Sequence, residues 1–231
     1  MTPAPTAAQS TKPLHLSKRS VTLRQRVYDK LRQAIIERRL PPGTKLVERD
    51  LCEQLGVSRP SLREALRHLE SEALIEMVPH KGSVVATLTA RDVREIYDIR
   101  ASLEGLVCER FAEFAADEHI ALLQQSYADL GQAAKQDNVD GILRAKTVFY
   151  QTLFEGSGCA ISQNLLTSLN ARIEVLRRMS ITRKDRNPRM MDEIKPIIEA
   201  AIRRDGPAMK ASCIAHLEGA RRAALTQLSI A

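Results

Sequence analysis

The segment from residue 58 to residue 70 constrains the fold of this chain more than any other. Ser58 can accept a hydrogen bond from a free backbone N–H at the start of a helix, and Pro60 falls early enough to remove no helical bond. The apolar residues that follow recur at spacings of three and four, which is typical of one buried helix face: Leu62, Ala65, Leu66, Leu69 and Ala73. The segment therefore predicts a short amphipathic helix.

The opposite face of this predicted helix is a ridge of arginines. Arg59, Arg63 and Arg67 are four residues apart, so their guanidinium groups line up. Such a ridge suits the major groove of DNA, where a guanidinium donates to guanine O6 and N7. A solvated basic face is the alternative. Just upstream, residues 51–57 predict a short helix that ends in Gly56 and leads into a short turn, which is helix-turn-helix spacing and favours the DNA interpretation.

A β-hairpin is predicted directly downstream. Two β-prone runs, 74–78 and 83–87, are joined by residues 79–82. Lys81 makes the tip of this hairpin basic, and Gly82 stands where a turn needs positive φ. A hairpin in this position is the wing of a winged helix-turn-helix.

These residues resemble the winged helix-turn-helix domain of GntR-family transcription regulators. The resemblance runs from about residue 23 to residue 86, in order and without gaps, and it rests on Pro42-Gly43-Thr44-Lys45-Leu46, Ser58-Arg59-Pro60-Ser61-Leu62-Arg63-Glu64-Ala65-Leu66 and Lys81-Gly82-Ser83-Val84-Val85. The resemblance implies that five residues contact DNA: Arg49, Ser58, Arg59, Ser61 and Arg63. It also implies that Gly82 enters the minor groove at the operator centre. Lys81 completes the expected DNA-binding set.

The charge of the chain is unevenly distributed. The formal charge is +7, and residues 1–88 hold 15 Lys and Arg against 9 Asp and Glu, whereas residues 89–231 hold 20 against 19. The basic excess therefore lies with the helix-turn-helix segment, as expected if that segment meets phosphates.

Several classes of protein are disfavoured by the sequence. The four cysteines form no CxxC pair, which indicates buried thiols in a reducing cytoplasm rather than a zinc or redox motif. No signal peptide opens the chain and no apolar run approaches the length of a membrane span. We therefore expect a cytoplasmic bacterial protein, associated with the nucleoid when bound to DNA, that needs no cofactor and is not an enzyme.

Three regions are expected along the chain: a disordered tail at 1–20, the winged helix-turn-helix at 21–88, and a helical domain at 89–231, for which the resemblance to GntR regulators implies effector binding and dimerisation. A basic arm that touches DNA is the alternative for the tail. Strand signals vanish after residue 88, and the segments that follow predict an all-helical bundle, so the fold class is mainly α. The predicted helices span 90–115, 118–136, 138–156, 160–182, 189–204 and 207–228. Thr89, three residues before Asp92, is a capping signal for the first of them, and residues 183–188 predict a charged loop before the fifth.

The second half resembles, by pattern more than by identity, the FCD domain of the FadR subfamily of GntR regulators. The resemblance rests on Tyr97-Asp98-Ile99-Arg100-Ala101-Ser102-Leu103-Glu104-Gly105-Leu106, Ala200-Ala201-Ile202 and Ala215-His216-Leu217. Many FCD domains hold a divalent metal through an Asp and three His. Here those positions are occupied by Lys146, Tyr150, Ile194 (or a neighbour, Glu193 or Lys195) and His216. An ammonium does not coordinate metal, so no metal site is expected.

The replacements suggest another ligand. Lys146 and Tyr150 lie among core positions of their predicted helix, and Arg100 does so on the first bundle helix. Buried cations need partners, because an unpaired buried charge is costly. One interpretation is that Arg100, Lys146, Tyr150 and His216 bind an anionic effector, of the carboxylate type. The alternative is structural: Arg100 pairs with Glu104 or with the linker, Lys146 extends to a bundle end, and His216 is an ordinary core histidine.

The sequence as a whole indicates a homodimeric transcription regulator, with family habit favouring a repressor. Two recognition helices would bind a pseudo-palindromic operator in double-stranded DNA, and the small effector would control affinity. One rival is a metal-binding helical sensor or enzyme domain fused to a DNA-binding head. Another is a protein that coats DNA without regard to sequence.

Overall fold

The computed structural model describes residues 23–182 and 186–229, so the predicted tail at 1–20 lies outside the described residues. The first half of the chain forms three helices and a hairpin: α1 (Leu23–Ile36), α2 (Glu48–Leu55), α3 (Arg59–Ser71), β1 (Ile75–Val78) and β2 (Gly82–Val85). The apolar face predicted for α3 is buried in the core that these elements share, where Leu62 and Leu69 are fully enclosed. Each helix here is too short to be stable alone, so this shared core fixes the pose of α3.

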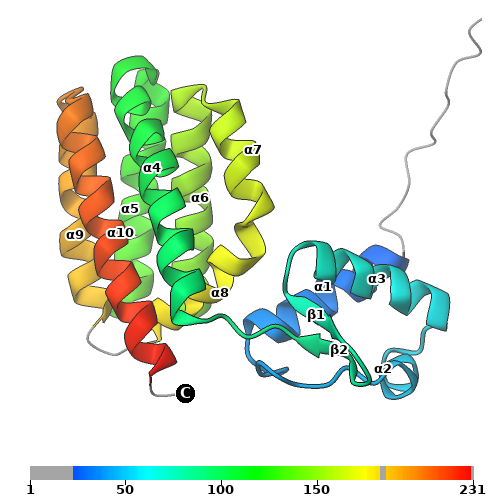
Figure 1. Ribbon diagram of the computed structural model, residues 1–231. Coiled ribbons are helices and arrows are strands. Elements are labelled where there is room, and N and C mark those ends of the chain that lie inside the picture. Colours follow the sequence, from blue (N-terminus) through cyan, green and yellow to red (C-terminus); the bar gives the residue numbers. More distant parts are fainter. Residues whose placement is uncertain (1–22, 183–185, 230–231) are drawn as a thin grey trace, which may run out of the picture.

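The hairpin follows the predicted positions closely. β1 and β2 pair antiparallel, with Ile75 opposite Val85 and Val78 opposite Gly82. A bridge between Lys45 and Val84 ties the hairpin to the segment that precedes α2. The hairpin therefore projects from the helices as a wing attached at its base (Figure 1).

The second half of the chain is entirely helical. Its helices are α4 (Ala90–Phe114), α5 (Asp117–Lys135), α6 (Val139–Ser157), α7 (Ala160–Ser168), α8 (Asn170–Ile181), α9 (Arg186–Ile202) and α10 (Gly206–Leu228). The long helices stand side by side around one apolar core, with α7 and α8 against the edge of the group (Figure 1). The predicted fold class, a winged helix-turn-helix followed by an all-α bundle, is confirmed.

Helix boundaries show where local sequence was informative. The predicted cap at Thr89 is confirmed: Asp92 N–H donates to the Thr89 hydroxyl, and Thr89 N–H donates to the Asp92 carboxylate at 2.7 Å, which is a capping box. Pro196 lies inside α9, and the helix nevertheless continues to Ile202.

Two predicted boundaries were wrong. The single helix predicted at 160–182 is two helices, α7 and α8, separated at Leu169. The hydroxyl of Ser168 donates to the Leu165 carbonyl at 2.7 Å, a local bond of the kind that competes with regular helix. The helix predicted to start at 189 begins earlier, because α9 already includes Arg186, which was predicted to lie in a charged loop, and buries that side chain.

The two halves meet through α8. Ala171 and Val175 of α8 pack against the core of the first half, while Ile173 and Leu176 of the same helix face the bundle core. Arg32 of α1 donates to Glu174 of α8 at 2.9 Å. Helix α8 therefore touches both halves (Figure 1).

Candidate functional site

The start of α3 is built around Ser58 and Pro60. Ser58 is the N-cap, with extended backbone (φ −73°, ψ 151°), as predicted. The predicted bond from the backbone to its hydroxyl is wrong, because Ser58 Oγ lies 3.1 Å from Ser61 Oγ instead. Pro60 explains part of this difference, since it occupies the second helical position and has no N–H to donate. The hydroxyls of Ser58 and Ser61 are thus held together at the N-terminus of α3, the helix that carries the arginine ridge.

The arginines on α2 and α3 are exposed. The side chains of Arg49, Arg63 and Arg67 keep 79%, 57% and 72% of their surface accessible. Arg63 Nε donates to both carboxylate oxygens of Glu48 on α2, at 3.1 and 3.0 Å. Arg59, also exposed, has no ion pair within residues 23–182 and 186–229. The predicted ridge therefore exists, and Glu48 holds Arg63 in place while leaving most of its surface open to a partner.

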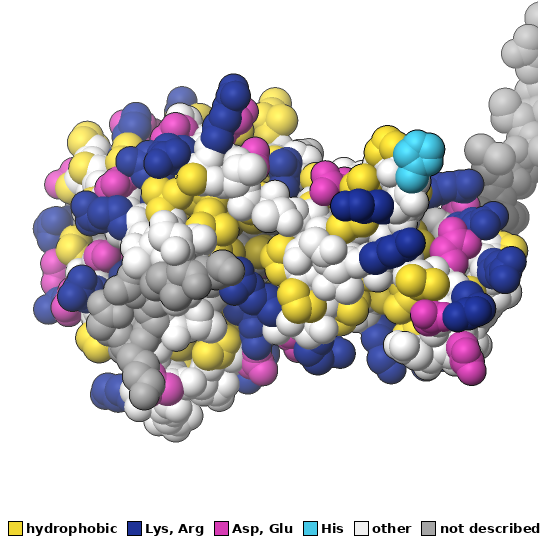
Figure 2. Space-filling model, turned by 60° about the horizontal axis from the view of Figure 1, so that its bottom comes forward, with side chains coloured by type: hydrophobic (Ala, Val, Ile, Leu, Met, Phe, Trp, Pro, Cys, Tyr) yellow, Lys and Arg dark blue, Asp and Glu magenta, His cyan; other side chains and the backbone are white. Residues whose placement is uncertain are grey.

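The wing carries the remaining predicted contacts. Gly82 has φ +83° and His80 has φ 63°, so the predicted turn with positive φ is confirmed. A Cβ at Gly82 would meet no neighbouring atom, which means that its backbone, not packing, demands glycine. Lys81 is exposed beside it. Figure 2 shows Lys and Arg side chains spread over the visible face of this half of the molecule.

The predicted effector residues lie in a buried polar cluster inside the bundle. Arg100 is only 2% exposed, and its Nε donates to Glu104 at 2.7 Å. Its Nη2 also donates to the Tyr150 hydroxyl at 3.2 Å. Burial lowers the pKa of Arg100, but Glu104, Tyr150 and Tyr97 together outweigh burial and raise it on balance. Arg100 therefore stays charged, and it joins α4 to α6.

Lys146 lies in the same cluster and does not extend to a bundle end. It is 5% exposed, and burial holds its pKa well below the usual range, helped by the charges of Arg177, Arg186 and Arg100. The Glu104 carboxylate opposes this shift without cancelling it. Burial and the neighbouring guanidinium groups therefore disfavour the charged form of Lys146.

His216 occupies the far side of the cluster. Its Nδ1 donates to Glu193 Oε2 at 2.9 Å, and Arg186 Nη2 donates to the same oxygen at 2.6 Å. Burial, with the charge of Lys146, lowers the pKa of His216 to about 3, so the ring is neutral. Burial raises the pKa of Glu193, yet the bonds from His216 and Arg186 lower it on balance, so this carboxylate is ionised.

Several buried polar atoms of the cluster have no hydrogen-bond partner among the described residues. They are Arg100 Nη1, Tyr97 Oη and Arg177 Nε. Arg177 instead places its guanidinium 4.1 Å from the centre of the Tyr150 ring. Buried donors are almost always satisfied in folded proteins, so each of these atoms needs a water molecule, an ion or a ligand as its partner, or else costs free energy. Three guanidinium groups share this cluster with two carboxylates, which leaves a positive excess even where the Lys146 amine is uncharged: Arg100, Arg177 and Arg186 against Glu104 and Glu193.

Sequence reasoning missed four members of this cluster or gave them no role: Tyr97, Arg177, Arg186 and Glu193. Arg177 follows Ile173 by four residues, so helical spacing places the two side chains on the same helix face. This spacing could have predicted that Arg177 lies beside the core. Arg186 was hidden in the predicted charged loop. Glu193, considered only as a shifted metal position, is the residue that meets His216. In the part of the chain that the structure describes, no group of three His, Cys, Asp or Glu side chains could hold a metal ion.

The cysteines are scattered, and those of the described range are free thiols. Cys108 and Cys213 are buried, whereas Cys52 and Cys159 are partly exposed, so the prediction of four buried thiols holds only for the first two. Within residues 23–182 and 186–229, no helix is both long enough and apolar enough to cross a bilayer.

An exposed arginine ridge on a winged helix-turn-helix, joined to a helical bundle, defines the class of DNA-binding transcription regulators. Two family models match the chain: the gntR family of bacterial regulatory proteins at residues 23–85, and the FCD domain at residues 95–219. The chain therefore belongs to the GntR family of transcription regulators and carries an FCD domain. It is not an enzyme.

Similar proteins agree with this membership. The HTH-type regulator YdhC of Bacillus subtilis is 30% identical over 190 residues, which cover 82% of this chain and 85% of that one. The HTH-type transcriptional repressor RspR of Escherichia coli is 27% identical, over 84% of this chain and 85% of its own. Among solved structures, E. coli McbR/YncC superposes with a TM-score of 0.74 at 23% identity, over 91% of this chain and all of the other, which shows the fold.

Proposed function

We propose that this regulator is a cytoplasmic homodimeric repressor whose operator affinity is controlled by a small carboxylate bound in the bundle. The observation that most supports this proposal is the positive excess of the buried cluster around Arg100 and Lys146. An anion is the ligand that would compensate this excess, because a buried charge is tolerated only when it is paired.

The geometry of Arg100 supports a carboxylate. Its Nε and Nη2 already bond Glu104 and Tyr150, while Nη1 has no partner among the described residues. A carboxylate oxygen can therefore accept from Nη1 without breaking the existing bonds. A second oxygen beside Lys146 would favour the charged ammonium and so raise the lowered pKa of this group. Arg100 and Lys146 bind the anion in this scheme, while Tyr150 and His216 shape its surroundings.

An exposed apolar face on α4 and α10 supports dimerisation. Ile99 and Leu106 of α4 are 37% and 38% exposed, and Ile214 of α10 is 40% exposed. Ile214 lies against α4 near Gly105, so these side chains form one surface. We expect Leu106→Asp in the full-length protein to yield monomers in sedimentation, while Glu118→Ala, an exposed change on α5, leaves the dimer intact. A dimeric Leu106→Asp protein would exclude this face.

The DNA-binding residues proposed for the operator contact are Arg49, Ser58, Arg59, Ser61, Arg63, Lys81 and Gly82. A two-fold dimer presents two copies of this set, so its operator would be a pseudo-palindrome. Repression is proposed by analogy with RspR and with the gluconate operon transcriptional repressor of B. subtilis, which is 28% identical over 84% of this chain.

A thermal-shift screen tests the proposed effector class. Full-length protein is heated with a panel of small carboxylates and with amines and sugars of similar size. We expect stabilisation by one or more carboxylates only, since a ligand that binds the folded state raises its melting temperature. The same compound should then release operator DNA. Stabilisation by uncharged compounds, with none by carboxylates, would contradict the proposal.

A further inference from the structure

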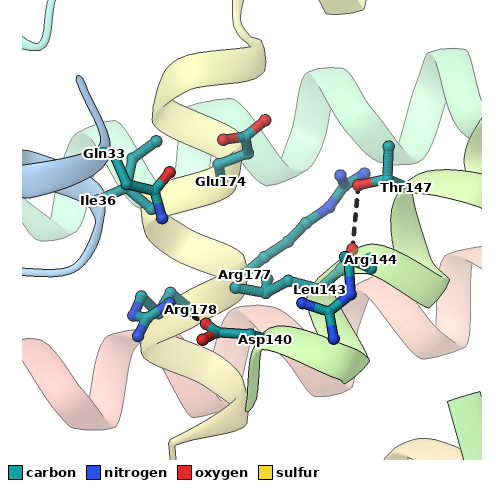
Figure 3. A pocket seen from close by; sticks show the side chains of 9 residues that line it. All are labelled: Gln33, Ile36, Asp140, Leu143, Arg144, Thr147, Glu174, Arg177 and Arg178. Carbon is teal, nitrogen blue, oxygen red and sulfur yellow. Dashed lines mark hydrogen bonds and ion pairs between the residues drawn. The ribbon is translucent and has the colours of Figure 1, made fainter. Parts of the chain in front are cut away.

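A cavity lies where the DNA-binding half meets the bundle. It has a volume of about 300 Å³ and is lined by residues of α1, α6 and α8 (Figure 3). Gln33 and Ile36 approach it from α1, Arg144 lines it from α6, and Arg177 lines it from α8. A cavity of this size is at the lower end of ligand-binding pockets, so it suits a compact molecule.

The charges of this cavity are not balanced. Its two carboxylates are already engaged, since Asp140 accepts from Arg178 at 3.0 Å and Glu174 accepts from Arg32 at 2.9 Å. Arg144 has no ion pair among the residues that the structure describes, and it is exposed to the cavity mouth. Arg144 and Arg177 would therefore meet a ligand here without a free carboxylate beside them.

Arg177 supplies the second observation. Its Nε is buried and has no hydrogen-bond partner within the described range. Burial lowers the pKa of Arg177, which is the response of a guanidinium that lacks a compensating anion. In Figure 3 its side chain extends from α8 toward Thr147 of α6, along the cavity wall.

The cavity is directly coupled to the recognition helix. Glu174 lines it and pairs with Arg32, and Arg32 Nε lies 3.6 Å from Glu72, directly after α3. Tyr28 of α1 donates to the same Glu72 at 2.7 Å and stacks on His68 of α3. A ligand that fixes α1 against α8 would therefore also restrict the pose of α3 relative to the bundle.

We propose that the cavity between α1, α6 and α8 binds a compact dianion, held by Arg144 and Arg177, that clamps the DNA-binding domain against the bundle. Guanidinium groups donate in a fork that fits either a phosphate group or a carboxylate. A phosphate monoester and a small dicarboxylate are both compact dianions whose oxygens accept hydrogen bonds from guanidinium groups. Arg177 borders both this cavity and the buried cluster around Arg100 and Lys146, whereas Arg144 belongs to this cavity alone.

Calorimetry on the full-length protein tests the proposal, with inorganic phosphate and malonate as the two probes at constant ionic strength set by chloride. We expect one probe or both to bind once per chain, with a dissociation constant on the order of millimolar. Arg144→Gln should weaken that binding about tenfold, because it removes a charged donor. Arg94→Gln, an exposed change on α4, is the control and should bind as the wild type does. The probe that binds more tightly shows whether the natural ligand is a phosphate compound or a dicarboxylate.

Hydrogen exchange locates the bound anion. Protection by the stronger probe should fall on α1 and α8, across the contact between the two halves. Protection confined to α4 and α10 would place the anion in the bundle cluster and overturn the proposal. So would binding that Arg144→Gln leaves unchanged, or the absence of binding by both probes at concentrations on the order of ten millimolar.

Discussion

The two halves of this protein use arginine in opposite surroundings. On α3 the side chain of Arg63 keeps 57% of its surface accessible, and its carboxylate partner Glu48 is also partly exposed. In the bundle Arg100 keeps 2%, and its partner Glu104 is equally buried. An exposed arginine needs no partner, because water solvates it, and it remains available to a polyanion. A buried arginine must be compensated, so a deficit of anions around it indicates a ligand.

The largest mutational effect is expected at Lys146, in the buried cluster. Lys146→Ala should abolish the release of operator DNA by the effector, because the compensating cation is removed from the buried cluster. Release is measured by fluorescence anisotropy of labelled operator across an effector titration. Lys135→Ala, an exposed change on α5, is the matched control and should respond normally. A Lys146→Ala protein that still responds would show that the buried charge is structural.

A smaller effect is expected on the exposed side. Arg63→Ala should cost roughly 1–3 kcal/mol on the cognate operator and relax specificity at one base position. The same titration on random DNA should change much less, since only a base contact distinguishes sequences. Arg110→Ala, an exposed arginine of the bundle, serves as control. An equal loss on cognate and random DNA would make Arg63 a phosphate contact.

A pH effect sharpens the account of the buried cluster. The pKa of His216 is lowered to about 3, so the folded protein keeps the ring neutral while the unfolded chain protonates it near its ordinary value of 6.5. The unfolded state therefore binds more protons below that value, and stability falls as pH decreases from 6.5 toward 3. The expected slope from this group is about 1.4 kcal/mol per pH unit, measured by urea unfolding. His216→Gln should remove that part of the slope, and an unchanged slope would contradict the burial of a neutral ring.

Removal of metal is expected to leave the melting temperature of the protein unchanged. Lys146 and Tyr150 occupy the positions of a carboxylate and an imidazole in related domains, so removal of metal should not loosen the bundle. Treatment with a chelator should leave the melting temperature unchanged in differential scanning calorimetry. A clear decrease, restored by one divalent ion per chain, would show that other residues rebuild the metal site.

The sequence predicted those parts of the molecule that local pattern controls. The apolar spacing of α3, the capping box at Thr89 and the positive φ of Gly82 all depend on residues near one another in the chain. The same spacing was unable to separate α7 from α8, because the break at Leu169 arises without glycine or proline.

The buried cluster was only half predictable. Arg100, Lys146 and Tyr150 stood out because polar residues occupied core positions of helices. Their partners were less visible, since pairs such as His216 with Glu193 join helices whose relative register is a tertiary property. Arg186 was assigned to a loop because its neighbours are charged, although its own side chain is 4% exposed.

Native mass spectrometry of gently purified full-length protein tests most directly whether the buried positive excess holds an anion. The account predicts that a fraction of wild-type chains carries one small organic anion each, and that Lys146→Ala chains carry none. The same spectra would reveal a bound metal ion by its mass. One divalent metal per chain without an organic anion, or the same adduct on both proteins, would contradict the account.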